Sequence, residues 1–288
     1  MWKAICGGLT AVLVLAGCGN FLAPVKDGPK TMDVKAKVRD FKEGNPTSPD
    51  GTHPHFNQGG ASCEAHLQGV NTVEEGLAAS GSSDPAFPGD ERAPVLAPLD
   101  GMPANVSRCF EPADRFPDWF EDKGTDVNRS FFFTLRFSQD ENTGLYEFRD
   151  EQFFPLDRGE GAKKASANAA EPFGNLQTGV KDGVELSGHD YGFTLEFHAM
   201  FIYSQGKGQK LSVRGDDDVW VFLNGKRVID LGGMHAAESD SADLDGLAGK
   251  LGLADKGRYP LDFYFAERST ASSKLAIVTN LQLTPYKP

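Results

Sequence analysis

Three consecutive aspartates before an apolar run carry the clearest chemical signal in the sequence. Asp216, Asp217 and Asp218 follow Gly215 and precede the run VWVFL at 219–223. Adjacent carboxylates repel one another, and a divalent cation would turn that repulsion into attraction. Calcium accepts about six to eight oxygen ligands in a flexible geometry, whereas magnesium requires near-octahedral order. From the residues alone two interpretations stay open: a solvated acidic turn, which is the simpler one, and a calcium site.

Further acidic residues follow in the same part of the chain. Residues 214–245 contain eight acidic and three basic side chains, the triplet included. The loop LGGMHAAESDSADLDGL lacks the spacing of an EF-hand, so any metal site must combine separate loops. The sequence has no Walker, dinucleotide, zinc-protease or GxSxG motif. Adjacent aspartates also differ from the separated acid and base of a glycosidase, so we expect no enzymatic activity.

Alternating and apolar runs predict the strands that must position these residues. Strands are expected over 32–40, 130–137, 144–148, 152–156, 193–203, 209–213, 219–223, 226–230, 259–266 and 274–283, with a short helix over 116–122 and an irregular region over 44–104. Asn224-Gly225 lies between two of these runs and is a strong hairpin signal, because both turn positions require positive φ. The pattern predicts an all-β fold, an antiparallel β-sandwich with long irregular N-terminal loops.

The composition agrees with this fold class and narrows the range of partners. The chain has 288 residues, which suits one large domain, and its 33 Gly, 17 Pro and 21 Phe favour a β-rich fold with many turns. Its net charge is −12. A nucleic-acid-binding protein normally presents a basic surface, so we expect no nucleic-acid partner.

The first residues read as an export signal. Lys3 precedes a short apolar run that is too short to span a bilayer. The run ends in Leu15-Ala16-Gly17-Cys18, which resembles the bacterial lipobox. That resemblance implies cleavage after residue 17, lipidation of Cys18 and attachment to the membrane through the lipid (palmitate included) alone. Residue 19 is Gly, whereas the inner-membrane retention signal is Asp, so the resemblance implies the outer membrane or cell surface. Residues 18–32 would then be a tether and 33–286 a single domain.

Two cysteines remain once the signal and the lipidated residue are set aside. Cys63 and Cys109 form an even pair in an exported chain, and one disulfide is the simplest interpretation. The alternative is a pair of free buried thiols. The sequence has no Cys/His spacing typical of zinc sites.

Two longer segments make the chain recognisable. The segments RGDDDVWVFLNGKRVIDLGGMHAAES and YPLDFYFAERSTASSKLAI closely resemble the fibro-slime domain of bacterial and slime-mould surface proteins. VKAKVRDF, FPDWFEDKGTDVNRSFFFTLRF and QFFPLD extend the resemblance over most of 33–284, and it is strongest over 189–280. The fibro-slime domain is similar in turn to the protective-antigen-type β-sandwich, a fourteen-kilodalton module of toxins, glycosidases and adhesins.

The resemblance implies a metal site. In the lectin branch of this fold, two consecutive aspartates joined by a cis peptide bind calcium, and they match Asp216 and Asp217. Asp218 stands where many relatives have Gly. A second loop completes the metal shell with an Asn in the lectins, and its counterpart here, 267–273, has none. Glu267 is the substitute ligand we expect, with a structural ion pair at Glu267-Arg268 as the alternative.

The resemblance also implies a function. We expect a lipid-anchored surface protein in which a calcium-stabilised β-sandwich recognises carbohydrate or another surface component. Selectivity would come from 232–240 and 267–273, and within them the candidate ligand contacts are His235, Glu238, Arg268 and Ser272. The alternative is a structural or adhesive envelope protein that has no sugar pocket.

Overall fold

The computed structural model of the protein describes most of the chain from residue 28 onward. The described residues are 28–42, 53–56, 69–157, 164–165, 172–173, 179–181, 184–186, 188–268 and 272–287. The predicted signal and residues 18–27 of the predicted tether, Cys18 included, lie outside them, as does Cys63. Within the described residues, no helix is both long enough and apolar enough to cross a bilayer.

Strands account for most of the regular structure. They are β1 (Thr31–Phe41), β2 (Val73–Ala79), β3 (Arg92–Leu96), β4 (Asn128–Gln139), β5 (Tyr146–Asp150), β6 (Lys164–Ala165), β7 (Gly179–Lys181), β8 (Val184–Leu186), β9 (Phe193–Ile202), β10 (Lys210–Asp216), β11 (Asp218–Leu223), β12 (Lys226–Leu231), β13 (Glu238–Asp243), β14 (Arg258–Glu267), β15 (Lys274–Thr279) and β16 (Thr284–Pro285). The α-helices are α1 (Ala104–Ser107) and α2 (Leu244–Leu251), and the 3₁₀ helices are η1 (Pro54–Phe56), η2 (Leu99–Gly101), η3 (Arg108–Phe110) and η4 (Ala113–Trp119).

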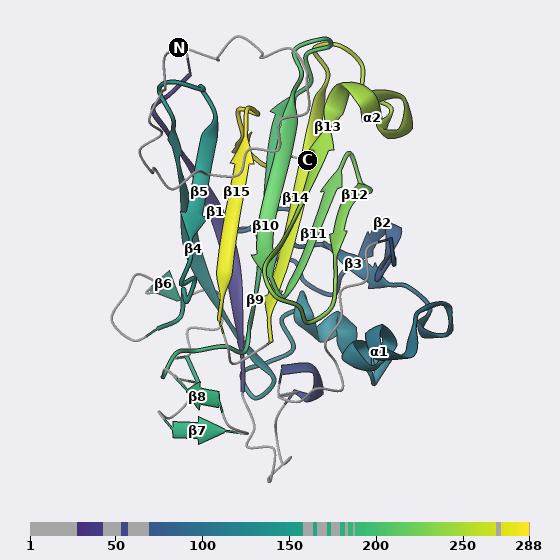
Figure 1. The fold of residues 1–288 in the computed structure, drawn as a ribbon, viewed down its shortest axis with the longest axis vertical. Helices are drawn as coiled ribbons and strands as arrows, with labels where there is room; N and C mark the ends of the chain where they lie inside the picture. The colour runs from purple at the N-terminus through teal and green to yellow at the C-terminus, as the bar shows by residue number, and fades with distance from the viewer. Residues whose placement is uncertain are drawn as a thin grey trace, which may run out of the picture.

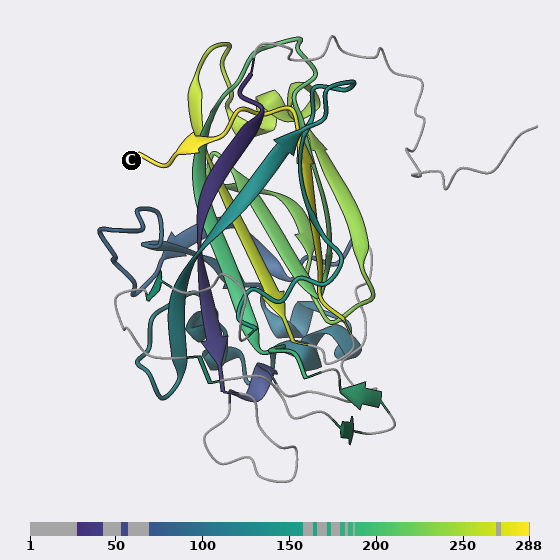
Figure 2. The same cartoon turned by 90° about the vertical axis from the view of Figure 1, so that its left-hand side faces the viewer.

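Nearly all strands join one antiparallel sheet. Its main path runs β13-β10-β15-β5-β4-β1-β9-β14-β11-β12-β2-β3, while β7 and β8 pair separately. The sheet curls so far that β12 and β13, far apart along this path, contact each other. Figure 1 shows the curl from the front, and Figure 2 shows β1 crossing beside β4. The predicted all-β antiparallel fold is confirmed, and its facing walls belong to one continuous sheet.

The sheet has an apolar layer on each side of its central strands. Val219, Val221 and Leu223 of β11 point into the main core inside the curl. Trp220 and Phe222, which alternate with them, point into a second apolar cluster on the other side. The near-continuous apolar run of this strand therefore reflects burial on both faces, as expected for a covered strand.

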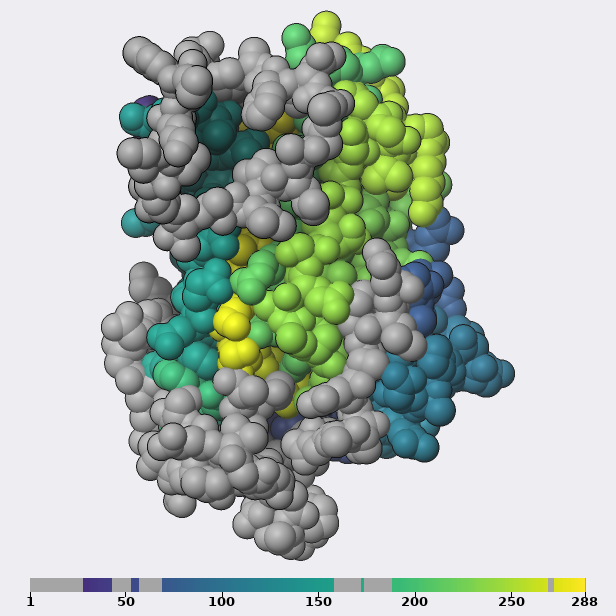
Figure 3. Space-filling model, viewed as in Figure 1, coloured from purple at the N-terminus to yellow at the C-terminus, as the bar shows by residue number. Residues whose placement is uncertain are grey.

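The second apolar layer is closed by residues 69–127, which we call the cover. The cover carries β2, β3, α1 and the 3₁₀ helices η2, η3 and η4, and its apolar side chains pack on strand residues such as Trp220 and Tyr264. It lies to the lower right of the sheet in Figure 1, and Figure 3 shows it beside the green C-terminal strands. Asp230 fastens one edge of the cover by accepting hydrogen bonds from the Thr72 amide and hydroxyl.

Most strand predictions are confirmed. The C-terminal strands lie within a few residues of their expected bounds, and the predicted hairpin is present with φ of 51° at Asn224 and 71° at Gly225. The short helix expected over 116–122 is η4, which begins three residues earlier.

Three expectations need correction. No strand forms over 152–156, where Phe153 and Leu156 are both buried in the core; their spacing of three does not match the alternation of a strand. The region 44–104 is not wholly irregular, since it supplies β2 and β3. The acidic loop after Gly233 contains β13 and α2, because β10 offers a free edge to pair with and Asp243 caps the helix.

Candidate functional site

The Asp triplet lies where the chain passes from one wall of the sheet to the other. Asp216 ends β10, which pairs with β13 and β15, and Asp218 begins β11, which pairs with β12 and β14. The Asp216–Asp217 peptide bond is cis, as the resemblance implies. All three carboxyl groups are buried, with exposed fractions of 3%, 1% and 0% along the triplet. A solvated acidic turn is therefore not what the structure shows.

Asp216 is held by the loop that precedes β15. The hydroxyl of Ser272 donates to Oδ2 of Asp216 over 2.7 Å, and the Lys274 amide donates to Oδ1. Burial raises the pKa of Asp216, although these two hydrogen bonds oppose the shift. Ser272, one of the candidate ligand contacts, is thus adjacent to the first aspartate.

Asp217 lies in a cradle of backbone amides. Its Oδ1 accepts from the His235 amide at 3.2 Å, and its Oδ2 accepts from the Arg268 amide at 2.9 Å. Burial raises the pKa of Asp217 to about 6; Arg268 acts against the shift and the neighbouring Asp218 adds to it. Two loops that are distant in sequence therefore meet at this carboxylate.

Asp218 is neutralised from within the protein. The Arg268 guanidinium donates to Oδ2 over 2.7 Å and to Oδ1 over 3.0 Å, and the Gly233 amide also donates to Oδ1. Arg268 further donates to the Cys109 carbonyl at 2.6 Å and lies over the Trp119 ring, with its guanidinium carbon 4.7 Å from the centroid. Its exposed fraction is 2%. The structure therefore places this candidate ligand contact inside, as the counterion of Asp218.

The remaining candidates lie close to the triplet in the sheet. Glu267 is buried at the end of β14, one residue beyond the partner of Asp218 in the strand register. Glu238 is exposed on β13 and pairs with Gly215, the residue before the triplet. His235 touches the site through its amide, while its ring contacts the Leu231 and Ala236 carbonyls. Residues 269–271 lie outside the described part.

A divalent ion fits only part of the predicted ligand set. Among the described residues, the hydrogen-bond donors to Asp216 and Asp217 are neutral and neither carboxylate forms an ion pair of its own, although the charge of Arg268 acts to lower the pKa of Asp217. Asp218, in contrast, is matched by Arg268. In the described ranges no three His, Cys, Asp or Glu side chains are arranged to hold a metal together. An ion at Asp216 and Asp217 would need carbonyls or waters for its other oxygens, which calcium accepts.

The groups that support the site could not be found from sequence. The amides of Gly233 and Lys274, the Cys109 carbonyl and the Trp119 ring come from four separate segments. Gly233, Lys274 and Trp119 lie in segments that resemble the fibro-slime domain, but the resemblance does not mark them as site residues, and backbone donors have no residue signature. Cys109 itself is buried and disulfide-bonded. Cys63 lies outside the described residues, so the pairing stays a prediction.

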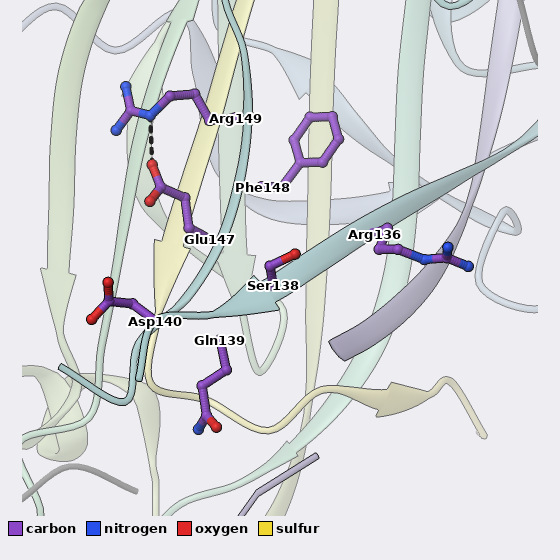
Figure 4. A pocket seen from close by; sticks show the side chains of 7 residues that line it. All are labelled: Arg136, Ser138, Gln139, Asp140, Glu147, Phe148 and Arg149. Atoms are coloured by element: carbon purple, nitrogen blue, oxygen red, sulfur yellow. Dashed lines mark hydrogen bonds and ion pairs between the residues drawn. The ribbon is translucent and has the colours of Figure 1, made fainter. Parts of the chain in front are cut away.

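A shallow hollow lies elsewhere, on the β4–β5 hairpin. It measures ≈ 410 Å³ and is lined by Arg136, Ser138, Gln139, Asp140, Glu147, Phe148 and Arg149. Figure 4 shows that Arg149 bonds to Glu147 and that Arg136 points away. Arg136 pairs instead with Asp33. Each charged group of the hollow thus has a partner, either within the hollow or beside it, and none of them belongs to the acidic site.

Sequence comparison finds one matching domain model and several similar proteins. Residues 175–287 match the PA14 domain model. Protein psiQ of Dictyostelium discoideum is 33% identical over 197 residues, which cover 68% of this chain and 18% of psiQ. Protein psiC of the same organism is 36% identical over 170 residues, covering 59% of this chain and 29% of psiC. The chain therefore spans less than a third of these relatives.

Solved structures give a more distant likeness. The structure titled "PA14 sugar-binding domain from RTX adhesin" shares 10% identity, and the match covers 49% of this chain and 75% of that one with a TM-score of 0.28. The fibro-slime resemblance and the lipobox stay predictions. The sequence comparisons therefore show a match to the PA14 domain model over residues 175–287 and a similarity to the psi proteins of Dictyostelium.

Proposed function

We propose that this chain is a calcium-dependent recognition module of the cell surface and that carbohydrate is its ligand class. The observation that carries the proposal is that Asp216 and Asp217 lie buried inside the PA14 match and, among the described residues, form no ion pair of their own. PA14 domains are associated with sugar binding and adhesion, which supports the choice of ligand. Membrane attachment through lipidated Cys18, in the outer membrane, belongs to the same proposal, and no catalytic activity does.

The residues of the site would have different roles. Asp216 and Asp217 would hold the ion, and Arg268 keeps Asp218 in place as a support. Glu267 is a further candidate ligand, since it is buried at the adjacent strand end. A bound calcium ion supplies positive charge and open coordination positions that sugar hydroxyls can fill. Ser272, His235 and Glu238 surround the aspartates and would set selectivity.

A second candidate function is favoured by burial. Because the three carboxyl groups are at most 3% exposed, an ion there could serve only to stabilise the fold. The protein would then be a structural or adhesive component of the envelope without a sugar pocket. The two functions agree on calcium and differ on whether a sugar reaches it.

A glycan array run with and without calcium tests the first function. We expect saturable binding by the wild type that is lost in chelator and in Asp217→Asn. Asp240→Asn is the matched control, because it removes an exposed acid from β13 and leaves the triplet intact. Calcium-dependent stability without binding to any glycan would support the second function.

The ion itself is tested by thermal unfolding. A ligand that binds only the folded state at 100 times its Kd adds about 2.7 kcal/mol of stability. Calcium should therefore raise the Tm of the wild type and of Asp240→Asn, but not that of Asp217→Asn. If chelated, metal-free wild type melts at the same temperature after calcium is added back, the calcium proposal is wrong.

A further inference from the structure

A chain of alternating charges lies between the sheet and the cover; its members are buried except for Arg92 and Asp122, whose side chains are 23% and 30% exposed. We call it the charge ladder, and in order its members are Arg92, Asp262, His198, Glu196, Arg39, Asp122, Lys37 and Asp90. Every neighbour in this order has the opposite charge when His198 is protonated. The acidic site has no such balance, and the two regions share no side chain.

The contacts along the ladder are short and continuous. Arg92 lies 2.7 Å from Asp262, which lies 2.9 Å from Nδ1 of His198. Nε2 of His198 lies 3.5 Å from Glu196, and Glu196 accepts from Arg39 at 2.6 Å. The second half continues through Asp122, Lys37 and Asp90 with separations of 2.9, 3.3 and 2.7 Å.

The ladder joins two parts of the molecule. Lys37 and Arg39 come from β1, Glu196 and His198 from β9, and Asp262 from β14. The other three members, Arg92, Asp90 and Asp122, come from the cover. The ladder is therefore the polar counterpart of the apolar packing between cover and sheet.

His198 is the only member that can lose its charge near neutral pH, and it is enclosed. The backbone of Gly89 lies so close that a Cβ there would fall 2.4 Å from the imidazole. Phe87 and Tyr264 pack on the ring at 5.4 and 5.8 Å between centroids, and Tyr286 lies at 6.2 Å. Phe87 and Gly89 belong to the cover, so the cover seals the histidine against the sheet.

We propose that the charge ladder is a latch that holds the cover on the sheet and that loss of the His198 proton opens it. With His198 neutral, Glu196 and Asp262 remain buried with one positive charge fewer than the ladder requires. Removing one partner from a buried ion pair leaves the other uncompensated, which strongly destabilises that contact. Because Asp90 and Arg92 directly follow the sealing residues Phe87 and Gly89 in the chain, we expect the cover to loosen first.

The environment of His198 supports this direction. Burial lowers its pKa, but the hydrogen bond with Asp262 and the ion pair with Glu196 outweigh burial and raise the pKa to about 9. The other groups around it are Arg92, bonded to Asp262, Arg39, bonded to Glu196, and the two tyrosines. Both carboxylates that touch the imidazole therefore favour its charged form at neutral pH.

Hydrogen exchange of the full chain, read by mass spectrometry, tests the latch. In His198→Gln at neutral pH we expect amides of 84–96 and 118–122 to exchange about 300-fold faster than in the wild type, because about 2.5 pKa units of coupling are lost. Amides of β10 and β15 should keep their protection. His189→Gln is the matched control, since His189 pairs with Asp157 outside the cover.

The wild type provides a test that needs no variant. Raising the pH through 9 should open the same cover segments, after correction for intrinsic exchange rates, while β10 and β15 stay closed. Unchanged protection of the cover in both His198→Gln and alkaline wild type would overturn the latch. So would an equal loss of protection over the whole sheet, because that reports global stability and not a local opening.

Discussion

The molecule buries charge in two places, and they are built differently. The charge ladder alternates four basic and four acidic groups along its length, and Asp84 adds a fifth carboxylate 3.7 Å from Lys37. At the acidic site three adjacent carboxyl groups are buried, and the buried Arg268 guanidinium pairs with one of them, Asp218. Along the ladder every carboxylate lies beside a cation of this chain, whereas among the described residues of the Asp triplet only Asp218 forms an ion pair.

This difference indicates which of the two regions could bind a cation. Buried charges persist in proteins when they are paired or coordinate a metal. The ladder meets that condition by pairing, and it joins the cover to the sheet. The acidic site meets it only at Asp218, and the surplus on Asp216 and Asp217 is what a divalent cation would balance. Variants that change the charge in one region at a time test this difference.

The largest effect is expected from removing the single cation of the acidic site. Arg268→Met should lower the free energy of unfolding by about 3–5 kcal/mol, because Asp218 stays buried without a counterion. Urea denaturation in chelator measures the change. A double variant with Asp218→Asn should recover part of the loss, since the uncompensated charge is gone. Equal stability of Arg268→Met and the wild type would contradict the assignment.

The ladder is expected to weaken in alkali. The pKa of His198 rises from its ordinary 6.5 to about 9, so its contribution is fully present below about pH 6.5 and is lost as the pH passes 9. The difference corresponds to about 3 kcal/mol in the free energy of unfolding. Urea denaturation across this pH range measures it. His198→Gln should lack this pH dependence, and an equal slope in both proteins would show that other groups cause it.

Removing surplus charge should cost little when no ion is present. Asp217→Asn in chelator should lower the free energy of unfolding by about 1–2 kcal/mol, because the amide oxygen keeps one backbone hydrogen bond while the other backbone donor loses its acceptor. Glu196→Gln removes a matched charge from the ladder and should cost about 3 kcal/mol or more. Urea denaturation of both variants tests this difference directly. Equal losses in the free energy of unfolding would show that the two regions do not differ in the way described.

The smallest effect is expected at an exposed ion pair. Arg214 and Glu151 lie 3.1 Å apart with side chains 35% and 51% exposed. Arg214→Met should lower the free energy of unfolding by at most about 1 kcal/mol, since water screens such pairs. Urea denaturation of Arg214→Met and Arg268→Met under the same conditions shows how much more a buried ion pair contributes than an exposed one. A loss as large as that of Arg268→Met would mean that burial does not separate the two pairs.

Sequence patterns predicted the strands best where both faces of a strand are apolar. The run at 219–223 is buried on both sides, and its hairpin turn needs two positive φ angles, so local signals suffice. Strand β13 was missed because its exposed acidic residues resemble a loop, although β10 pairs with it. Edge strands depend on a neighbour for their backbone bonds, and no local pattern reports that neighbour.

The triplet was predictable as a cluster, but its surroundings were not. Adjacent aspartates and the resemblance located Asp216 and Asp217 and predicted the cis bond. The pairing of Asp218 with Arg268 joins residues 50 apart. Lys37 and Arg39 alternate with Ala36 and Val38, which in sequence predicts a solvent-facing side. They are buried instead because the cover lies over them, and nothing near them in the sequence reveals it.

The position of β1 has a consequence for how the chain is synthesised. This first strand lies in the middle of the sheet, between β4 and β9, and Arg39 meets Glu196 across 157 residues. A chain that emerges from the ribosome or the export channel amino end first must keep this segment unpaired on one side until residue 202 has followed. Contacts between such distant residues form slowly, because a long loop must close before they contribute. The centre of the sheet is therefore among the last parts to be completed, although it contains the strand that appears first.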